Sequence, residues 1–201
     1  MRRESQMRVL MCAFAAATVL FAACGGDSKK AATPTTGAQS PPAAKSTPST
    51  AATCPTPPAG PVTTLQYQAP ATSQTQAVLN GVQVTTAACS DTATFTFAGP
   101  GLPGYEAKYV QAPLACGSGN PVTTAGPAQL TLRFEPAVAH DNNGNVTVSP
   151  LSFAPNDPSI KELKSTCDFE GVVAWVIGTE ARYYTVTTAQ SPSRVIVEVY
   201  H

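Results

Sequence analysis

The stretch FEGVVAWVIG, residues 169–178, is the strongest core signal in the chain. It is apolar on both faces apart from Glu170. A strand with this pattern is buried on both sides, as strands between two covering layers are. We therefore predict a central strand here, and the flanking segments must supply the layers around it.

Shorter segments on both sides of this stretch alternate apolar and polar residues with a period of two, which is typical of half-buried strands. The clearest ranges are 82–86, 92–97, 105–110, 130–134, 182–188 and 194–200. Gly- and Pro-rich turns separate them, residues 160–164 fit either a strand or one helical turn, and no long amphipathic helix stands out. About eight short strands of this kind predict an all-β fold, a single antiparallel β-sandwich domain.

The beginning of the chain has the composition of an export signal. Arginines precede an uncharged apolar run, residues 9–23, which is shorter than the roughly 20 residues of a membrane span. The run ends in LFAAC, which resembles the lipobox of bacterial lipoproteins except that Phe21 stands where Leu is usual. We predict a lipoprotein signal peptide over residues 1–23 and a lipid anchor on Cys24 that holds the protein to the outer face of the cell membrane.

Two points about this region stay open. An ordinary secretory signal ending near Ala23 is the alternative to lipidation, and translation starts at either Met1 or Met7. After Cys24, the range 24–63 is rich in Ala, Pro, Thr and Ser. Such a composition buries too little apolar surface to offset the entropy of ordering. We predict a disordered tether here, with or without glycosylation, and a folded domain over residues 64–201.

The charge of the domain limits what it can bind. From Leu65 onward there are six basic and ten acidic residues, a net charge of −4. Because no basic patch appears, we predict no nucleic-acid partner. The same sign disfavours simple electrostatic capture of anionic wall polymers, so recognition there must rely on shape and hydrogen bonds.

The cysteines predict disulfides. Cys12 lies in the signal peptide and Cys24 is assigned to the lipid, which leaves Cys54, Cys89, Cys116 and Cys167. An even number in an exported chain indicates two bonds, with three possible connectivities. We favour a bond between Cys89 and Cys167, and Cys54 would then pair with Cys116. Zinc is a poor alternative because the spacings are wide and contain no C-x-x-C.

Catalytic and metal-binding signals are weak. The segment HDNNGN, residues 140–145, lacks the glutamate that an EF-hand loop needs at its twelfth position, where Ser152 stands, so we predict a hairpin turn. The histidines are His140 and His201, too few for a zinc hydrolase and poorly placed to activate a nucleophile. Glu170 is best explained as an acid at a strand end. We predict no enzyme, no metal and no cofactor.

Several segments carry a resemblance when they are taken in order. They are PGY at 103–105 with Tyr109-Val110, Gly126 with 130–136, DFEGVV at 168–173 and SPSRVIVEV at 191–199. Together, over about residues 81–201, they resemble the AMIN-like domain of actinobacterial lipoproteins. Two positions depart from the family: residues 89–93 keep only Asp91 of the usual entry to the first long strand, and Glu198 replaces an aspartate.

The resemblance implies a small β-sandwich related to the AMIN domains that localise cell-wall amidases and secretin channels, for which peptidoglycan association is the usual proposal. We therefore predict a non-catalytic envelope module that binds peptidoglycan or another envelope protein. Exposed aromatic and planar polar groups suit carbohydrate, so we single out Tyr105, Tyr109 and Arg194 as candidate binding residues, although strand aromatics more often pack in the core. A small-ligand or lipid carrier with a cavity between the sheets is the alternative, and a hydrolase is less favoured.

Overall fold

The computed structural model describes residues 53–57, 59–180 and 182–201. The predicted signal peptide, the lipidation site at Cys24 and most of the predicted tether lie outside these residues. Every described strand lies within the compact unit Pro48–His201. Among the described residues, no helix has the length and apolar character needed to span a membrane.

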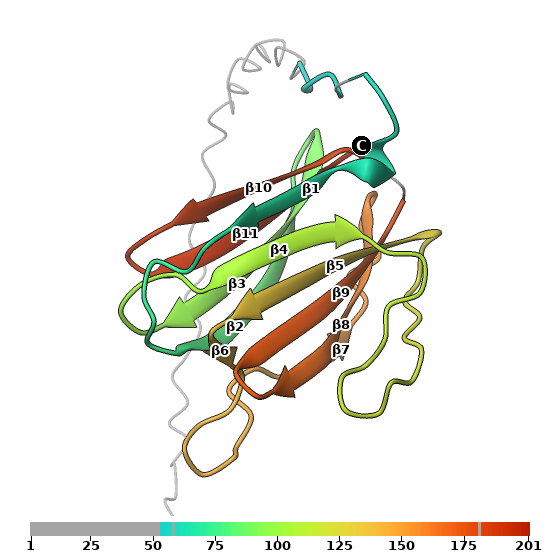
Figure 1. The fold of residues 1–201 in the computed structure, drawn as a ribbon. Helices are drawn as coiled ribbons and strands as arrows, with labels where there is room; N and C mark the ends of the chain where they lie inside the picture. The colour runs from blue at the N-terminus through green and yellow to red at the C-terminus, as the bar shows by residue number, and fades with distance from the viewer. Residues whose placement is uncertain (1–52, 58, 181) are drawn as a thin grey trace, which may run out of the picture. The chain divides into compact units, whose positions relative to one another are not determined.

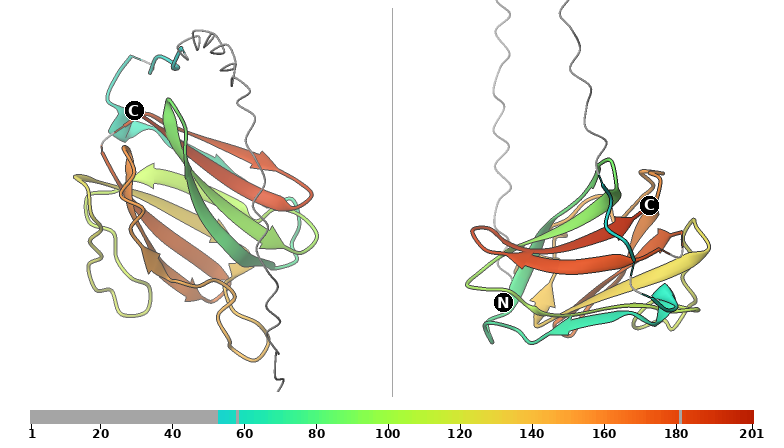
Figure 2. Two further views of the ribbon diagram at one scale, coloured as in Figure 1. Left: turned by 180° about the vertical axis from the view of Figure 1, so that it is seen from behind. Right: turned by 90° about the horizontal axis from the view of Figure 1, so that it is seen from above.

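The strands form two sheets that face each other across a common core (Figures 1 and 2). Sheet I has six strands in the order β1 (Gln66–Ala69), β4 (Gly104–Tyr109), β5 (Ala128–Glu135), β9 (Val172–Thr179), β8 (Ile160–Phe169) and β7 (Ser152–Phe153). Sheet II has five strands in the order β10 (Tyr184–Ala189), β11 (Ser193–Tyr200), β3 (Ser90–Ala98), β2 (Ala77–Thr86) and β6 (Ala137–Val138). All neighbours are antiparallel except β2 and β6, which are parallel. A 3₁₀ turn, η1 (Val62–Thr64), precedes β1. The predicted all-β sandwich is confirmed.

Alternation along the strands fills the space between the sheets. Phe95 on β3 meets Phe134 on β5 at 5.1 Å and Trp175 on β9 at 6.0 Å between ring centroids, and these three side chains are fully buried. Tilted and edge-to-face rings at such distances add attraction beyond the area they bury. Because β9 lies between β5 and β8 and its inner face holds Trp175, it is the central strand that the sequence predicts.

The beginning of that predicted strand is wrong. Phe169 ends β8, and Glu170 and Gly171 form a turn with φ of 49° and 78° before β9 begins at Val172. Positive φ at both central residues is the geometry of a two-residue type I′ hairpin, in which glycine is favoured at the second position. Glu170 therefore lies at a strand end, as predicted, and Phe169 is 57% exposed.

The structure also contains more strands than the predicted number. Strands β6 and β7 have two residues each, which is too short to show a period. Residues 160–164 begin the ten-residue strand β8, whose register shifts between Ile160 and Glu162 and again between Ser165 and Cys167. These irregularities break the alternation of apolar and polar residues, which explains why the sequence pattern was ambiguous there.

The predicted disulfide pairing is wrong, although all four predicted cysteines are bonded. Cys54 pairs with Cys89, with Cα atoms 5.3 Å apart, and Cys116 pairs with Cys167, with Cα atoms 5.2 Å apart. Cys89 lies between β2 and β3, on sheet II, whereas Cys167 lies on β8, on sheet I. A bond between Cys89 and Cys167 would have joined the sheets. Instead, each bond ties a separate segment to one sheet.

A buried carboxylate links the two sheets. Asp91, near the start of β3, is fully buried, and its Oδ2 accepts hydrogen bonds from the backbone N–H groups of Ser159, at 2.5 Å, and Ile160, at 2.9 Å. Ile160 begins β8 in the opposite sheet. Asp91, which the resemblance singles out before the first long strand, is therefore part of the interior, where it holds the start of β8.

Candidate functional site

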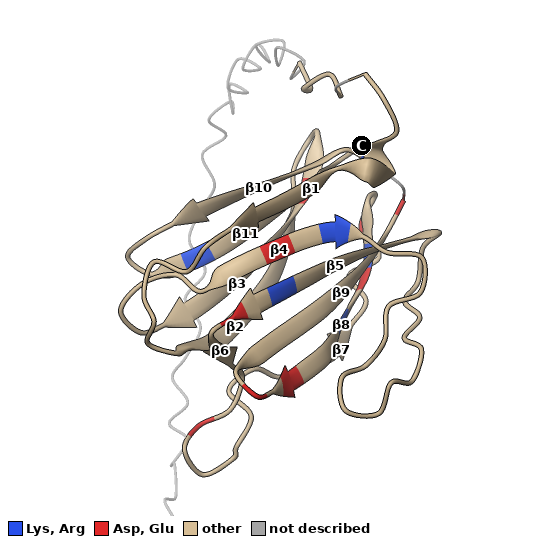
Figure 3. Ribbon diagram, viewed as in Figure 1, with Lys and Arg blue, Asp and Glu red and all other residues tan. Residues whose placement is uncertain are grey.

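Charged and polar side chains gather on the outer face of sheet I. The strand register places Gln68, Glu106 and Arg133 side by side on β1, β4 and β5. The neighbouring row of outward-facing residues contains Lys108 on β4 and Thr131 on β5. Figure 3 shows these acidic and basic segments lying next to each other on β4 and β5. Antiparallel pairing thus brings residues that are far apart in the sequence into one cluster.

This face is hollowed. One hollow of about 580 Å³ is lined by residues that include Gln68, Pro70, Tyr105, Glu106, Arg133 and Glu135. A second hollow of about 290 Å³ is lined by residues that include Lys108, Leu114, Thr131, Ala174 and Val176, and it shares Glu106 and Arg133 with the first. The two hollows are therefore adjacent, and we call them together the polar trough.

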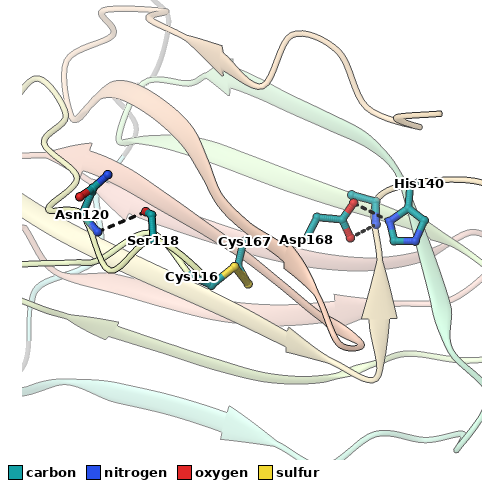
Figure 4. The surroundings of a disulfide bond; sticks show 7 residues. Cys116, Ser118, Asn120, His140, Cys167 and Asp168 are labelled. Carbon is teal, nitrogen blue, oxygen red and sulfur yellow. Dashed lines mark hydrogen bonds and ion pairs between the residues drawn. A yellow bond between two sulfur atoms is a disulfide. The ribbon is translucent and has the colours of Figure 1, made fainter. Parts of the chain in front are cut away.

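The segment between β4 and β5 forms one wall of the polar trough, where Leu114 is 57% exposed. The bond from Cys116 to Cys167 fixes this segment to β8 (Figure 4). The backbone N–H of Cys116 also donates to the carbonyl of Thr166 at 3.0 Å. We call residues 110–127 the wall loop. Its covalent attachment ties this wall of the trough to β8.

Further contacts attach the wall loop to the sheet. The Nζ of Lys164 on β8 donates to the carbonyl of Thr123 at 2.9 Å, and the backbone N–H of Ala125 donates to Oε2 of Glu162 at 2.8 Å. Closer to the loop's tip, the N–H of Asn120 donates to the Ser118 hydroxyl at 3.2 Å (Figure 4). The wall is therefore held by β8 at several points along its length.

The charges within the polar trough are balanced. Lys108 Nζ lies 2.7 Å from Oε1 of Glu106, which also accepts a hydrogen bond from Gln66 at 2.8 Å. Arg133 lies 2.5 Å from Glu135. The four charged groups are partly exposed, so these ion pairs contribute little stability. Such a surface suits a neutral or zwitterionic ligand rich in hydrogen-bonding groups rather than a polyanion.

Two of the predicted binding residues turn towards the core. Tyr105 borders the polar trough, but its side chain packs against the buried cluster. The Tyr109 hydroxyl donates to the carbonyl of Arg182 at 2.8 Å and lies 3.2 Å from Oγ1 of Thr179. Burial raises the pKa of Tyr109, and these two hydrogen bonds offset only part of that effect. Tyr109 also meets the fully buried Tyr184 at 5.4 Å between ring centroids, so both tyrosines hold the sandwich together.

The third predicted residue is on the other sheet. Arg194 lies on β11, between Ala189 on β10 and Thr96 on β3. The next residue, Val195, is buried on the inner face, so Arg194 lies on the outer face of sheet II. Its Nε is buried and has no hydrogen-bond partner within the described residues. The structure therefore does not bring Arg194 together with Tyr105 and Tyr109.

The histidine predicted to lie in a turn has a structural partner. His140 Nδ1 lies 2.7 Å from Oδ2 of Asp168, whose Oδ1 accepts the backbone N–H of Ala139 at 2.9 Å (Figure 4). Asp141 then accepts hydrogen bonds from Asn145 and Asn143, which lower its pKa and close the predicted hairpin turn. Across the described ranges, no group of three or more His, Cys, Asp or Glu side chains could hold a metal ion.

The residues of the polar trough were missed at the sequence level. Glu106 with Lys108, and Arg133 with Glu135, are charged residues two positions apart on predicted strands, so each pair shares a strand face. This signal was available in the sequence. Residue type alone favours the tyrosines, whose rings pack against the core instead.

Comparison with known protein families matches residues 77–201 to the AMIN-like domain. No curated protein and no solved structure gives a significant match. The matched residues include all of sheet II, all of sheet I except β1, the lining of the polar trough except for residues 68–71, and both members of the Cys116–Cys167 bond. The match covers more than half of the chain, and the chain therefore belongs to the AMIN-like domain family.

Proposed function

We propose that this protein is a non-catalytic, lipid-anchored component of the cell envelope whose AMIN-like domain binds peptidoglycan through the polar trough. Membership of the family suggests an envelope, peptidoglycan-associated role. The observation that carries the proposal is the trough itself: a hollowed, charge-balanced sheet face with a wall held by a disulfide. Peptidoglycan offers hydroxyl, amide, carboxylate and ammonium groups, and Gln68, Glu106 and Arg133 supply matching donors and acceptors.

The interior of the sandwich gives less support to a ligand carrier. Trp175, Tyr184, Phe95, Phe97 and Phe134 are almost completely buried between the sheets, and their rings pack against one another or against neighbouring rings. A carrier would need open space in this region. A hydrolytic role is also poorly supported, because Glu106 and Glu135 are each paired with a cation and the lining of the trough contains no histidine.

The first disulfide gives the proposed tether a defined end. If Cys24 carries lipid, the Cys54–Cys89 bond leaves about 29 residues free between membrane and domain, a reach of roughly 90 Å at ~3.1 Å per residue in an extended chain. The bond joins Cys54 to the turn between β2 and β3, on sheet II, and the proposed tether would end there. The proposal therefore leaves the outer face of sheet I free to meet the wall.

The test is co-sedimentation of the compact unit Pro48–His201 with sacculi stripped of secondary polymers. Arg133→Gln should weaken saturable binding at least fivefold, because it removes both a fork of donors and a charge from the centre of the trough. Arg194→Gln makes the same chemical change on the other sheet and should leave binding unchanged. Absence of binding by the wild type, or equal loss in both variants, would overturn the proposal.

A further inference from the structure

The edges of the two sheets are not equally protected. Strand β1 has four residues and is followed by Pro70. Strands β6 and β7 have two residues each and pair with only two residues of β2 and of β8, but both of these longer strands contain register shifts. Strand β10 is the edge of sheet II and has six residues, YTVTTA, with no charge and no proline. Its pairing with β11 is regular from end to end. Proteins usually blunt such edges with charges, prolines, bulges or short strands, and β10 has none of these.

The pairing pattern shows which backbone groups of β10 face outward. The carbonyl of Tyr183 accepts the N–H of Tyr200 at 2.9 Å, so these two residues form a hydrogen-bonded pair. Hydrogen-bonded pairs alternate in an antiparallel ladder, so Thr185, Thr187 and Ala189 also bond to β11. It follows that Tyr184, Val186 and Thr188 direct their N–H and C=O groups away from the sheet.

We propose that a second copy of this chain pairs its β10 antiparallel with this edge, centred on Val186 of both copies. In that register Tyr184 lies opposite Thr188, and Val186 lies opposite itself. These are the positions with outward backbone groups, so all of those groups are satisfied. The result is one continuous sheet made from two copies of sheet II.

The side chains of β10 fit this occupant. Residues that face each other across an antiparallel pair lie on the same side of the sheet. Thr185 therefore lies opposite Thr187 on the outer side, a Thr–Thr pair that is favourable across strands, and the two Val186 side chains meet on the inner side. No like charges oppose each other at any of these positions. A partner strand of different sequence would need to offer the same favourable facing residues and the same absence of opposed like charges, and a second β10 already offers both.

The pairing is small and should be weak in dilute solution, because a single strand contact buries less area than the roughly 1,200 Å² of a stable interface. Thr187 and Thr188 are exposed, so the edge is accessible. The compact unit Pro48–His201, which contains the core and both disulfides, is the material for the test.

Sedimentation equilibrium over a wide concentration range should show a monomer–dimer equilibrium for the wild type. Thr188→Pro removes an outward N–H without touching the β11 ladder, and Thr188→Lys puts a charge on the edge. Both variants should raise the dimer dissociation constant at least tenfold, while Thr94→Lys should not, because Thr94 lies on the interior strand β3 and is paired on both sides, with Ile196 and Gln83. Circular dichroism checks that each variant is folded. A wild type that stays monomeric at every concentration, or a dimer that these two variants leave intact, would overturn the proposal.

Crosslinking tests the register even if both edge variants fail to fold. Thr185→Cys and Thr187→Cys, mixed and oxidised, should form a covalent heterodimer, because these positions face each other at a non-hydrogen-bonded site. Either variant alone should crosslink much less. Equal crosslinking in the mixture and in the single variants would contradict the Val186-centred register.

Discussion

The outer faces of the two sheets differ in how many charged side chains they carry and in how deeply they are hollowed. The outer face of sheet I is hollowed, carries Glu106, Lys108, Arg133 and Glu135 at its centre, and is flanked by the wall loop. The outer face of sheet II carries Arg194 and Glu198 on β11, two rows apart, within cross-strand rows that are rich in threonine, such as Thr94 on β3 beside Ile196 on β11. Blue and red segments are concentrated on β4 and β5 in Figure 3, while β10 carries neither.

This contrast separates the requirements of the fold from those of binding. The inner faces of both sheets are constrained because every side chain there must fit the core. The side chains on the outer faces need only be compatible with strand formation, and the threonines of sheet II meet that requirement. The charges and the covalently held wall on sheet I exceed what a strand needs, and this excess is why we place the binding site there.

The largest expected effect comes from the two disulfides. Replacing both cysteines of either bond by alanine should lower the free energy of unfolding by about 4 kcal/mol in the chain-entropy estimate, because the bonds close loops of similar size, with sequence separations of 51 and 35 residues. Urea unfolding followed by Trp175 fluorescence measures this loss. Of the two double variants, only Cys116→Ala with Cys167→Ala should also weaken binding to sacculi, measured at urea concentrations too low to unfold the protein.

The matched pair Cys54→Ala with Cys89→Ala is the control for stability, because it leaves the wall loop attached. Equal loss of binding in both double variants would mean that binding follows overall stability. The distinction between the two faces would then be lost.

A smaller effect should follow when each face is filled with a bulky side chain. Ala174→Phe places a ring in the floor of the polar trough, and Thr94→Phe places the same ring at the centre of the outer face of sheet II. Both positions are on outer faces, so unfolding free energies should change by about 1 kcal/mol or less. Binding to sacculi should fall about tenfold for Ala174→Phe, roughly 1.4 kcal/mol, and stay unchanged for Thr94→Phe. If Thr94→Phe weakened binding and Ala174→Phe did not, the binding site would lie on sheet II instead.

The fold could largely be predicted because its signal is local. Period-two alternation identified the long strands, and the apolar run through Trp175 identified the central one. Strand β1 was missed because its four residues contain a single large apolar side chain, Tyr67. The disulfide pairing depends on where the wall loop crosses β8, and no local pattern encodes that path.

The candidate site was harder to predict because it depends on register. The sequence shows that Glu106 and Lys108 share a strand face, but not that Arg133 lies beside Glu106. It also cannot tell which tyrosines face inward, and the choice of Tyr105 and Tyr109 rested on residue type alone. A shift of one residue between β4 and β5 would have exchanged the inner and outer sets.

The smallest expected effect concerns acid. Burial would raise the pKa of Glu162, but the Ala125 N–H, Lys164 and the Ser152 hydroxyl outweigh it and hold the pKa below its usual 4.5. A carboxyl whose pKa is lowered by folding stabilises the fold above its unfolded pKa, and this contribution is lost as pH falls through the lowered value. The wall loop should therefore loosen below about pH 4.5.

Sacculus binding measured between pH 7 and pH 3 should weaken about two- to fivefold below that point, because one partly exposed hydrogen-bonded contact contributes about 1 kcal/mol or less. Glu162→Gln should bind slightly less well at pH 7 and lose part of this acid dependence. Glu198→Gln, on the outer face of sheet II, should keep the wild-type profile. An acid dependence that survives in Glu162→Gln but disappears in Glu198→Gln would show that sheet II, and not the wall of the polar trough, responds to protonation.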